Sequence, residues 1–158
     1  MPKLCRFTIL CAGLLFALGC ELVEPESKAA RKQRDENFDF STVSWLGPAY
    51  PDTQRDKNAI LHSASMDREA NVLTLSYDPL PEDWPSEGNA LGQLVMFEEL
   101  DDDRWRGGRV AWLDADQTEI SLDDIDRAWP LPPSGTRIAI VILSTDGQFC
   151  TNAVFSDD

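Results

Sequence analysis

One apolar run near the end of the chain constrains the fold more than any other segment. Residues Arg137–Ser144 read RIAIVILS, an unbroken apolar stretch rich in β-branched side chains. Such a run is typical of a central strand buried on both faces of a sheet. It is followed by Asp146-Gly147, and Asp-Gly between two β runs is a strong hairpin signal because glycine takes positive φ at no steric cost. We therefore predict a central strand that turns at Gly147 into a second strand over Gln148–Phe155.

Further short segments have the alternation or composition of strands. Residues Asn71–Tyr77 alternate apolar and polar side chains, which is the period of a half-buried strand. The runs Gly92–Leu100 and Arg104–Leu113 flank a polar turn of three aspartates and are predicted to pair as a hairpin. The remaining predicted strands are Ser41–Leu46, Ala59–Ser65 and Thr118–Leu122.

The connectors complete the prediction of fold class. Prolines fall between the predicted strands, no long amphipathic helix is visible, and only Asp123–Trp129 suggests a brief helical turn. Many short strands separated by turns favour an all-β domain. We predict a single β-sandwich of about eight short strands, immunoglobulin-like or jelly-roll-like, with a small barrel as the alternative.

The first twenty residues have the layout of a targeting segment. Lys3 and Arg6 are followed by an uncharged, almost wholly apolar run over Phe7–Leu18. This run is shorter than the roughly 20 residues that a membrane-spanning helix requires, and it matches the apolar region of a secretory signal. The chain becomes polar directly after Cys20. The sequence therefore predicts a signal peptide that is removed at this point.

The residues Ala17-Leu18-Gly19-Cys20 resemble the lipobox of bacterial lipoproteins. Gly19 fits that pattern, whereas Ala17 stands where leucine is usual and would also suit the ordinary signal peptidase. The resemblance implies cleavage before Cys20, a diacylglycerol on its sulfur and an acylated amine, which together give stable anchoring. In this family an aspartate after the cysteine favours the inner membrane, so Glu21 implies the outer membrane, facing the periplasm.

The predicted processing defines three parts of the chain. Residues 1–19 form the signal peptide, residues 20–41 a lipidated cysteine with a flexible tether, and residues 42–158 the β-sandwich domain. The tether segment is charged, mixed in sign and poor in large aliphatic residues, so it cannot build a core. Cys5 and Cys11 leave with the signal peptide. Cys150 is then interpreted as a small buried hydrophobe, or as a partner for Cys20 if that sulfur is not lipidated.

The charge balance narrows the choice of partners. The net charge of the chain is −14, and removal of residues 1–19 takes away Lys3 and Arg6 and no acid, so it falls to −16. Such a surface repels nucleic acid, which requires clustered positive charge. We expect contact with the membrane through acyl chains on Cys20, with an envelope protein or polysaccharide as partner and no cofactor.

Two tryptophans are candidates for ligand binding. Trp84 and Trp129 lie in proline-bounded loops, where an indole can stack on the apolar face of a sugar ring. The alternative is that each indole covers one end of the sandwich. Trp112 and Trp45 lie in strand-like alternation and are predicted to be core residues, whereas Trp105 is compatible with either position.

Three short motifs are similar to those of small secreted bacterial β-sandwich modules. They are the Trp-Leu-Gly-Pro of residues 45–48, the Trp-x-Gly-Gly of residues 105–108, and the Ser-x-Asp-Gly hairpin at residue 144 with Asn152 beyond it. Some modules of this kind sit beside carbohydrate-active domains. The resemblance supports the fold and implies no function.

The remaining polar residues give no catalytic or metal site that we would predict. The acids gather at residues 101–103 and again in Asp114, Asp116, Asp123, Asp124 and Asp126, without the spacing of a known calcium loop. His62, the only histidine, lies in a predicted strand and is interpreted as half-buried, and the chain left after removal of residues 1–19 has too few His and Cys for zinc. Paired carboxylates for glycoside hydrolysis stay open because acids are plentiful.

These observations predict a membrane-anchored envelope lipoprotein with a non-enzymatic structural or partner-binding domain. The alternative is a carbohydrate-binding module that uses Trp84 and Trp129, and an envelope hydrolase ranks last. A sugar-binding module requires an exposed tryptophan platform. A hydrolase requires two carboxylates across a cleft with His62 or an arginine nearby.

Overall fold

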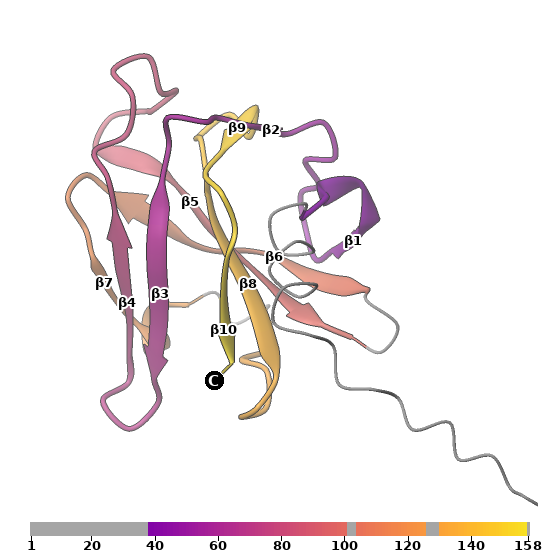
Figure 1. The fold of residues 1–158 in the computed structure, drawn as a ribbon. Helices are drawn as coiled ribbons and strands as arrows, with labels where there is room; N and C mark the ends of the chain where they lie inside the picture. Colours follow the sequence, from indigo (N-terminus) through magenta and orange to yellow (C-terminus); the bar gives the residue numbers. More distant parts are fainter. Residues whose placement is uncertain (1–37, 101–103, 126–129, 158) are drawn as a thin grey trace, which may run out of the picture.

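The computed structural model describes residues 38–100, 104–125 and 130–157, and Figure 1 shows their arrangement. These ranges form ten β-strands and short 3-10 turns, without an α-helix. The all-β prediction is therefore confirmed. Among the described residues no helix has the length and apolar character needed to cross a membrane.

A seven-stranded mixed sheet forms the larger layer, and it curls strongly (Figure 1). Its strand order is β1-β6-β5-β8-β9-β2, and β10 also pairs with β8. The strands are β1 (Val43–Trp45), β2 (Gln54–Arg55), β5 (Ala90–Glu99), β6 (Trp105–Asp114), β8 (Arg137–Leu143), β9 (Phe149–Cys150) and β10 (Val154–Asp157). The two strands at the ends of this order, β1 and β2, pair in parallel with β6 and β9.

The second layer is a sheet of three antiparallel strands. It has the order β3-β4-β7 and consists of β3 (Leu61–Asp67), β4 (Val72–Tyr77) and β7 (Glu119–Ser121). Leu73 and Leu75 on β4 and Ile120 on β7 pack against the larger sheet, meeting an aliphatic cluster that includes Leu94 and Ile140. We call this cluster the inter-sheet core.

Strand β8 confirms the prediction of a strand buried on both faces, since all seven of its residues are buried. Its even-numbered residues Ile138, Ile140 and Ile142 belong to the inter-sheet core. Its residues Ala139, Val141 and Leu143 belong to a second cluster on the opposite face of the same sheet. The twofold side-chain period of a strand thus divides one apolar run between two cores.

The second cluster is aromatic and is covered by the segment Phe38–Arg55, which we call the strap. The strap begins with a 3-10 turn, η1 (Phe40–Thr42), and contains both parallel strands, β1 and β2 (Figure 1, indigo). It supplies four aromatic side chains to the cluster, and the other strands of the sheet supply three. The seven residues of this aromatic face are Phe38, Phe40, Trp45, Tyr50, Phe97, Trp105 and Phe155.

The packed part of the chain starts before the boundary at residue 42 that the sequence predicts. The ring of Phe38 lies 5.5 Å from that of Phe97 and 5.4 Å from that of Trp105. Phe40 is buried and stacks on Trp45 at 5.9 Å. The last residues assigned to the tether therefore pack on the domain through two aromatic side chains, of which Phe40 is buried and Phe38 is half-buried.

The predicted hairpins and strands agree with the structure in most places. Strands β5 and β6 pair antiparallel, and Gly147 turns β8 into β9 with a φ of 75°. The two-residue strand β2 was not predicted. The predicted strand Gln148–Phe155 is divided into β9 and β10. The division occurs because the side chains of Thr151 and Asn152, which lie between these two strands, form hydrogen bonds with the Ile142 amide and the Leu61 carbonyl. The predicted helical turn is a 3-10 turn, η3 (Leu122–Asp124), and its end at residues 126–129 lies outside the described ranges.

Candidate functional site: a cleft beneath the strap

A cleft of about 330 Å³ lies between the strap and the larger sheet. This volume is in the range of small-ligand sites, which span roughly 300–1,000 Å³. Its walls come from the start of the strap, from β2 and from β8, β9 and the segment after β9. The lining residues are Phe38, Asp39, Phe40, Pro51, Thr53, Arg55, Val141, Cys150, Thr151 and Ala153.

The start of the strap is shaped by a local cap. One carboxylate oxygen of Asp39 accepts a hydrogen bond from the Ser41 amide at 2.8 Å, and this bond caps the start of the 3-10 turn that follows. This cap fixes the chain direction between Phe38 and Phe40, so that both rings reach the aromatic face while the carboxylate stays at the cleft. The same hydrogen bond lowers the pKa of Asp39, so its side chain is ionised at neutral pH.

The two hydroxyls that line the cleft are already engaged in the fold. The Thr53 hydroxyl shares its proton between the carbonyl oxygens of Tyr50 (2.8 Å) and Gly147 (2.7 Å). The Thr151 hydroxyl donates to the Asn152 carbonyl at 2.9 Å and accepts from the Ile142 amide at 3.1 Å. Neither hydroxyl therefore has a proton left for a ligand.

The charged groups of the cleft are Asp39 and Arg55. Both side chains are exposed at the cleft, and within the part of the chain that the structure describes neither forms an ion pair. The next acid, Asp56, is directed elsewhere, since its carboxylate accepts from the Asn58 amide at 2.8 Å and does not line the cleft. The cleft thus presents one negative and one positive group above apolar walls.

Cys150 lies in the wall of this cleft. The residue is 2% exposed, and burial raises its pKa to about 12, with the positive charge of Arg55 acting in the opposite direction. A thiol with this pKa is protonated at neutral pH and is a poor nucleophile. Its position agrees with the interpretation of Cys150 as a small buried hydrophobe. Cys20, the predicted lipidation site, lies outside the described residues.

A second hollow of about 330 Å³ lies on the other side of the same strap segment. It is lined by the strap residues Ala49–Gln54 and by the hairpin residues Gly147–Phe149. The two hollows share Pro51 and Thr53, so this short segment separates them.

Of the two tryptophans singled out for sugar binding, the structure describes only Trp84. Trp84 is only 6% exposed, and its indole N–H donates to the Leu91 carbonyl at 2.9 Å. It therefore lacks the exposed face that stacking requires, and its position agrees with the alternative of an indole that covers the core. Trp129 lies outside the described residues.

Trp112 is exposed, so its assignment to the core was wrong. The pairing of β5 with β6 shifts between Leu94 and Val95, and Val110 is the extra residue on β6. Because of this bulge, Val110 and Leu113 both enter the inter-sheet core although they are three residues apart. Trp112 is 48% exposed, and the Arg109 guanidinium lies 5.2 Å from its ring centre.

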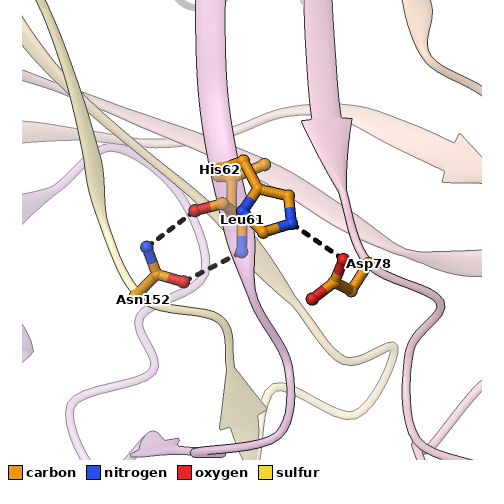
Figure 2. Close-up of polar contacts among 4 residues, drawn as sticks. All are labelled: Leu61, His62, Asp78 and Asn152. Carbon is orange, nitrogen blue, oxygen red and sulfur yellow. Dashed lines mark hydrogen bonds and ion pairs between the residues drawn. The ribbon is translucent and has the colours of Figure 1, made fainter.

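His62 forms a surface pair instead of a catalytic group. Its Nε2 atom lies 2.8 Å from a carboxylate oxygen of Asp78, and both side chains are about half exposed (Figure 2). Among the described residues no serine, threonine or cysteine hydrogen-bonds to His62. This agrees with the interpretation of a half-buried strand histidine, since His62 lies in β3 and about half of its side chain is exposed.

The acidic clusters of the sequence form no metal site in the described ranges. There, no three His, Cys, Asp or Glu side chains come close enough to hold an ion. Asp116 occupies a turn with a φ of 63°. Residues 101–103 and Asp126 lie outside the described residues.

Comparison with protein-family models, with curated proteins and with solved structures finds no significant match.

The cleft was not predicted from the sequence. Its two charged residues are separated by sixteen positions, and the thiol in its wall lies almost a hundred residues further on. The nearest sequence signal is the pair of phenylalanines around Asp39, which stands out in an otherwise polar segment.

Proposed function

We propose that this protein is a lipid-anchored lipoprotein of the bacterial envelope whose β domain binds a partner without catalysing a reaction. The anchor is inferred from the signal-like segment and from Cys20. The observation that supports the binding role is the cleft beneath the strap, which combines apolar walls with two oppositely charged groups. We further propose the outer membrane, facing the periplasm, because Glu21 follows the cysteine.

The proposed arrangement places the cleft close to the bilayer. The strap begins at Phe38, eighteen positions after Cys20, and Phe38 itself lines the cleft. A flexible chain of this length spans about 25 Å on average. The domain would then stand clear of the lipid head groups, with its cleft on the side where the chain enters.

Intact mass measurement of the protein extracted from membranes tests the anchor. We expect a mass equal to residues 20–158 plus acyl chains, and release of a Cys20→Ala variant from the membrane fraction. A Glu21→Gln variant controls for changes near the cleavage site and should stay membrane-bound. A bare peptide mass for the native protein would contradict the proposal.

For the fold, we propose the β-sandwich class. The inter-sheet core supports it, because the three-stranded sheet packs its aliphatic face against the larger sheet. The immunoglobulin-like and jelly-roll-like assignments have weaker support, since both describe antiparallel sheets, whereas β1 and β2 pair in parallel here.

Carbohydrate binding is the second candidate, and the exposure of Trp112 favours it. The Arg109 guanidinium restrains the ring on one strand of a rigid sheet, which is the setting that a stacking platform needs. Titration with soluble envelope glycans should then quench tryptophan fluorescence in the wild-type protein and not in Trp112→Ala. Equal quenching in both proteins would exclude this platform.

An envelope hydrolase ranks last among the proposals. It would require two carboxylates across a cleft, whereas the cleft beneath the strap is lined by a single carboxylate, that of Asp39, within the described ranges.

A further inference from the structure

The cleft beneath the strap has features that restrict its ligand more narrowly than its volume does. Phe38, Phe40, Pro51, Val141 and Ala153 give it an apolar wall. Such a wall favours a ligand with an aliphatic or aromatic body, because apolar surface is removed from water on both partners.

The polar groups left for a ligand are charged and opposite in sign. The hydroxyls of Thr53 and Thr151 are engaged within the fold, as described above. Asp39 uses one carboxylate oxygen for the Ser41 amide and keeps the other, and Arg55 has no hydrogen bond to another described residue. Both side chains line the same cleft without neutralising each other in an ion pair.

A ligand with a single charge would meet one attractive and one repulsive group. A carboxylate bound at Arg55 would share the cleft with the carboxylate of Asp39, and an amine bound at Asp39 would share it with the guanidinium of Arg55. A ligand that carries both charges satisfies both residues at once. Because hydrogen bonds to charged groups are stronger than neutral ones, this arrangement also selects against an uncharged ligand.

We propose that the cleft binds a small apolar zwitterion, namely an apolar α-amino acid or the dipeptide built from it. The ammonium group of the ligand lies against Asp39, its carboxylate against Arg55, and its apolar side chain or chains against the apolar wall. This inference rests on the cleft being the binding site of the proposed function and does not depend on the lipid anchor.

The test uses the mature chain, residues 20–158, and four probes. The zwitterions are L-leucine and Leu-Leu, and the matched half-ligands are 4-methylpentanoate, which lacks the amine, and isoamylamine, which lacks the carboxylate. Binding is followed by amide chemical shifts in NMR titrations. We expect at least one zwitterion to bind with shifts at the strap, β2 and β9, and each half-ligand to bind roughly tenfold more weakly or not at all.

Variants at the two charged positions assign the ends of the ligand. Arg55→Gln should weaken zwitterion binding roughly tenfold and leave isoamylamine binding unchanged or improved. Asp39→Asn keeps an acceptor for the Ser41 amide, so it should preserve the cap and weaken zwitterion binding by a similar factor. Lys57→Gln and Asp83→Asn change the charge equally at exposed positions away from the cleft and serve as controls.

The possible results separate this inference from the proposed function. Half-ligands that bind as well as the zwitterion, shifts outside the cleft, or equal effects of Arg55→Gln and Lys57→Gln would overturn the zwitterion assignment. The same holds if no probe binds. The anchor is judged from the intact mass alone, so either proposal can fail while the other stands.

Discussion

The two faces of the seven-stranded sheet are covered in different ways. On one face, the inter-sheet core is mostly aliphatic and is covered by the three antiparallel strands of the smaller sheet. On the other face, the strap supplies aromatic side chains from a segment that contains only five strand residues, three in β1 and two in β2. Both hollows are lined by strap residues.

This difference shows how a binding site can be added to a small β domain. Aliphatic side chains on regular strands interdigitate and leave little empty volume. A strap with few strand hydrogen bonds must instead be held by ring contacts, such as Trp45 against Phe97 at 5.1 Å and against Tyr50 at 5.7 Å. Rings packed edge to face leave gaps beside them, and charged residues of the strap can face these gaps.

The largest effect is expected from a substitution that creates a cavity in the inter-sheet core. Ile140 on β8 is fully buried, and Ile140→Ala should lower the free energy of unfolding by about 4 kcal/mol. Urea unfolding followed by far-UV circular dichroism measures the change, with the exposed Ser65→Ala as control. A loss below about 1 kcal/mol would show that this core is less tightly packed than its burial indicates.

A substitution in the strap should have a somewhat smaller effect. Phe40 is buried, but it also borders the cleft, so Phe40→Ala should cost about 3 kcal/mol, at the low end for a phenylalanine. Hydrogen exchange should show faster opening of strap amides than of β4 and β5 amides in this variant. Equal acceleration in all strands would mean that the strap and the sheets unfold as one unit.

The hairpin that supports the strap should tolerate no side chain at Gly147. A Cβ there would lie 2.1 Å from the Tyr50 ring, and the residue has positive φ. We expect Gly147→Ala to cost about 2 kcal/mol. Gly88 also has positive φ but open space around it, so Gly88→Ala should cost only about 1 kcal/mol, and equal losses would rule out the contact with Tyr50 as a cause.

Alkaline pH should lower the free energy of unfolding through ionisation of the Cys150 thiol in the wall of the cleft. Its pKa in the folded protein, about 12, lies above the ordinary value of 9.0, so its contribution to stability is complete below pH 9 and is lost between pH 9 and 12. The stability difference between wild type and Cys150→Ala should therefore shrink by about 1 kcal/mol from pH 9 to pH 10. A difference that stays constant over this interval would contradict the buried, protonated thiol. Titration of Tyr77, whose pKa burial also raises, is common to both proteins and cancels.

The smallest expected effect is at Trp112. Because this side chain is half exposed, Trp112→Ala should change the free energy of unfolding by less than about 0.5 kcal/mol. Trp105, on the same strand but buried in the aromatic face, provides the contrast, since Trp105→Ala should cost about 3 kcal/mol. A large loss at Trp112 would show that the indole contributes to packing.

The sequence predicted best where local pattern and final environment agree. The apolar run of β8 and the Asp-Gly turn after it are strong signals within a few residues, and both occur as predicted. Strand β1 pairs in parallel with β6, about sixty positions away, and β2 pairs in parallel with β9, about ninety-five positions away. A single sequence carries no signal for pairings at this distance. Trp112 was misassigned because a bulge at Val110 reverses the alternation, and bulges leave no mark in hydrophobic periodicity.

The side chain of Asn152 has a consequence for contacts between copies of the protein. Its amide donates to the Leu61 carbonyl and accepts from the Leu61 N–H, both at 2.8 Å, as a neighbouring strand would (Figure 2). Unpaired groups at a sheet edge can recruit a strand from another molecule. At Leu61 these groups are occupied from within the same chain, so copies of the protein at high concentration would have no starting point there for edge-to-edge aggregation.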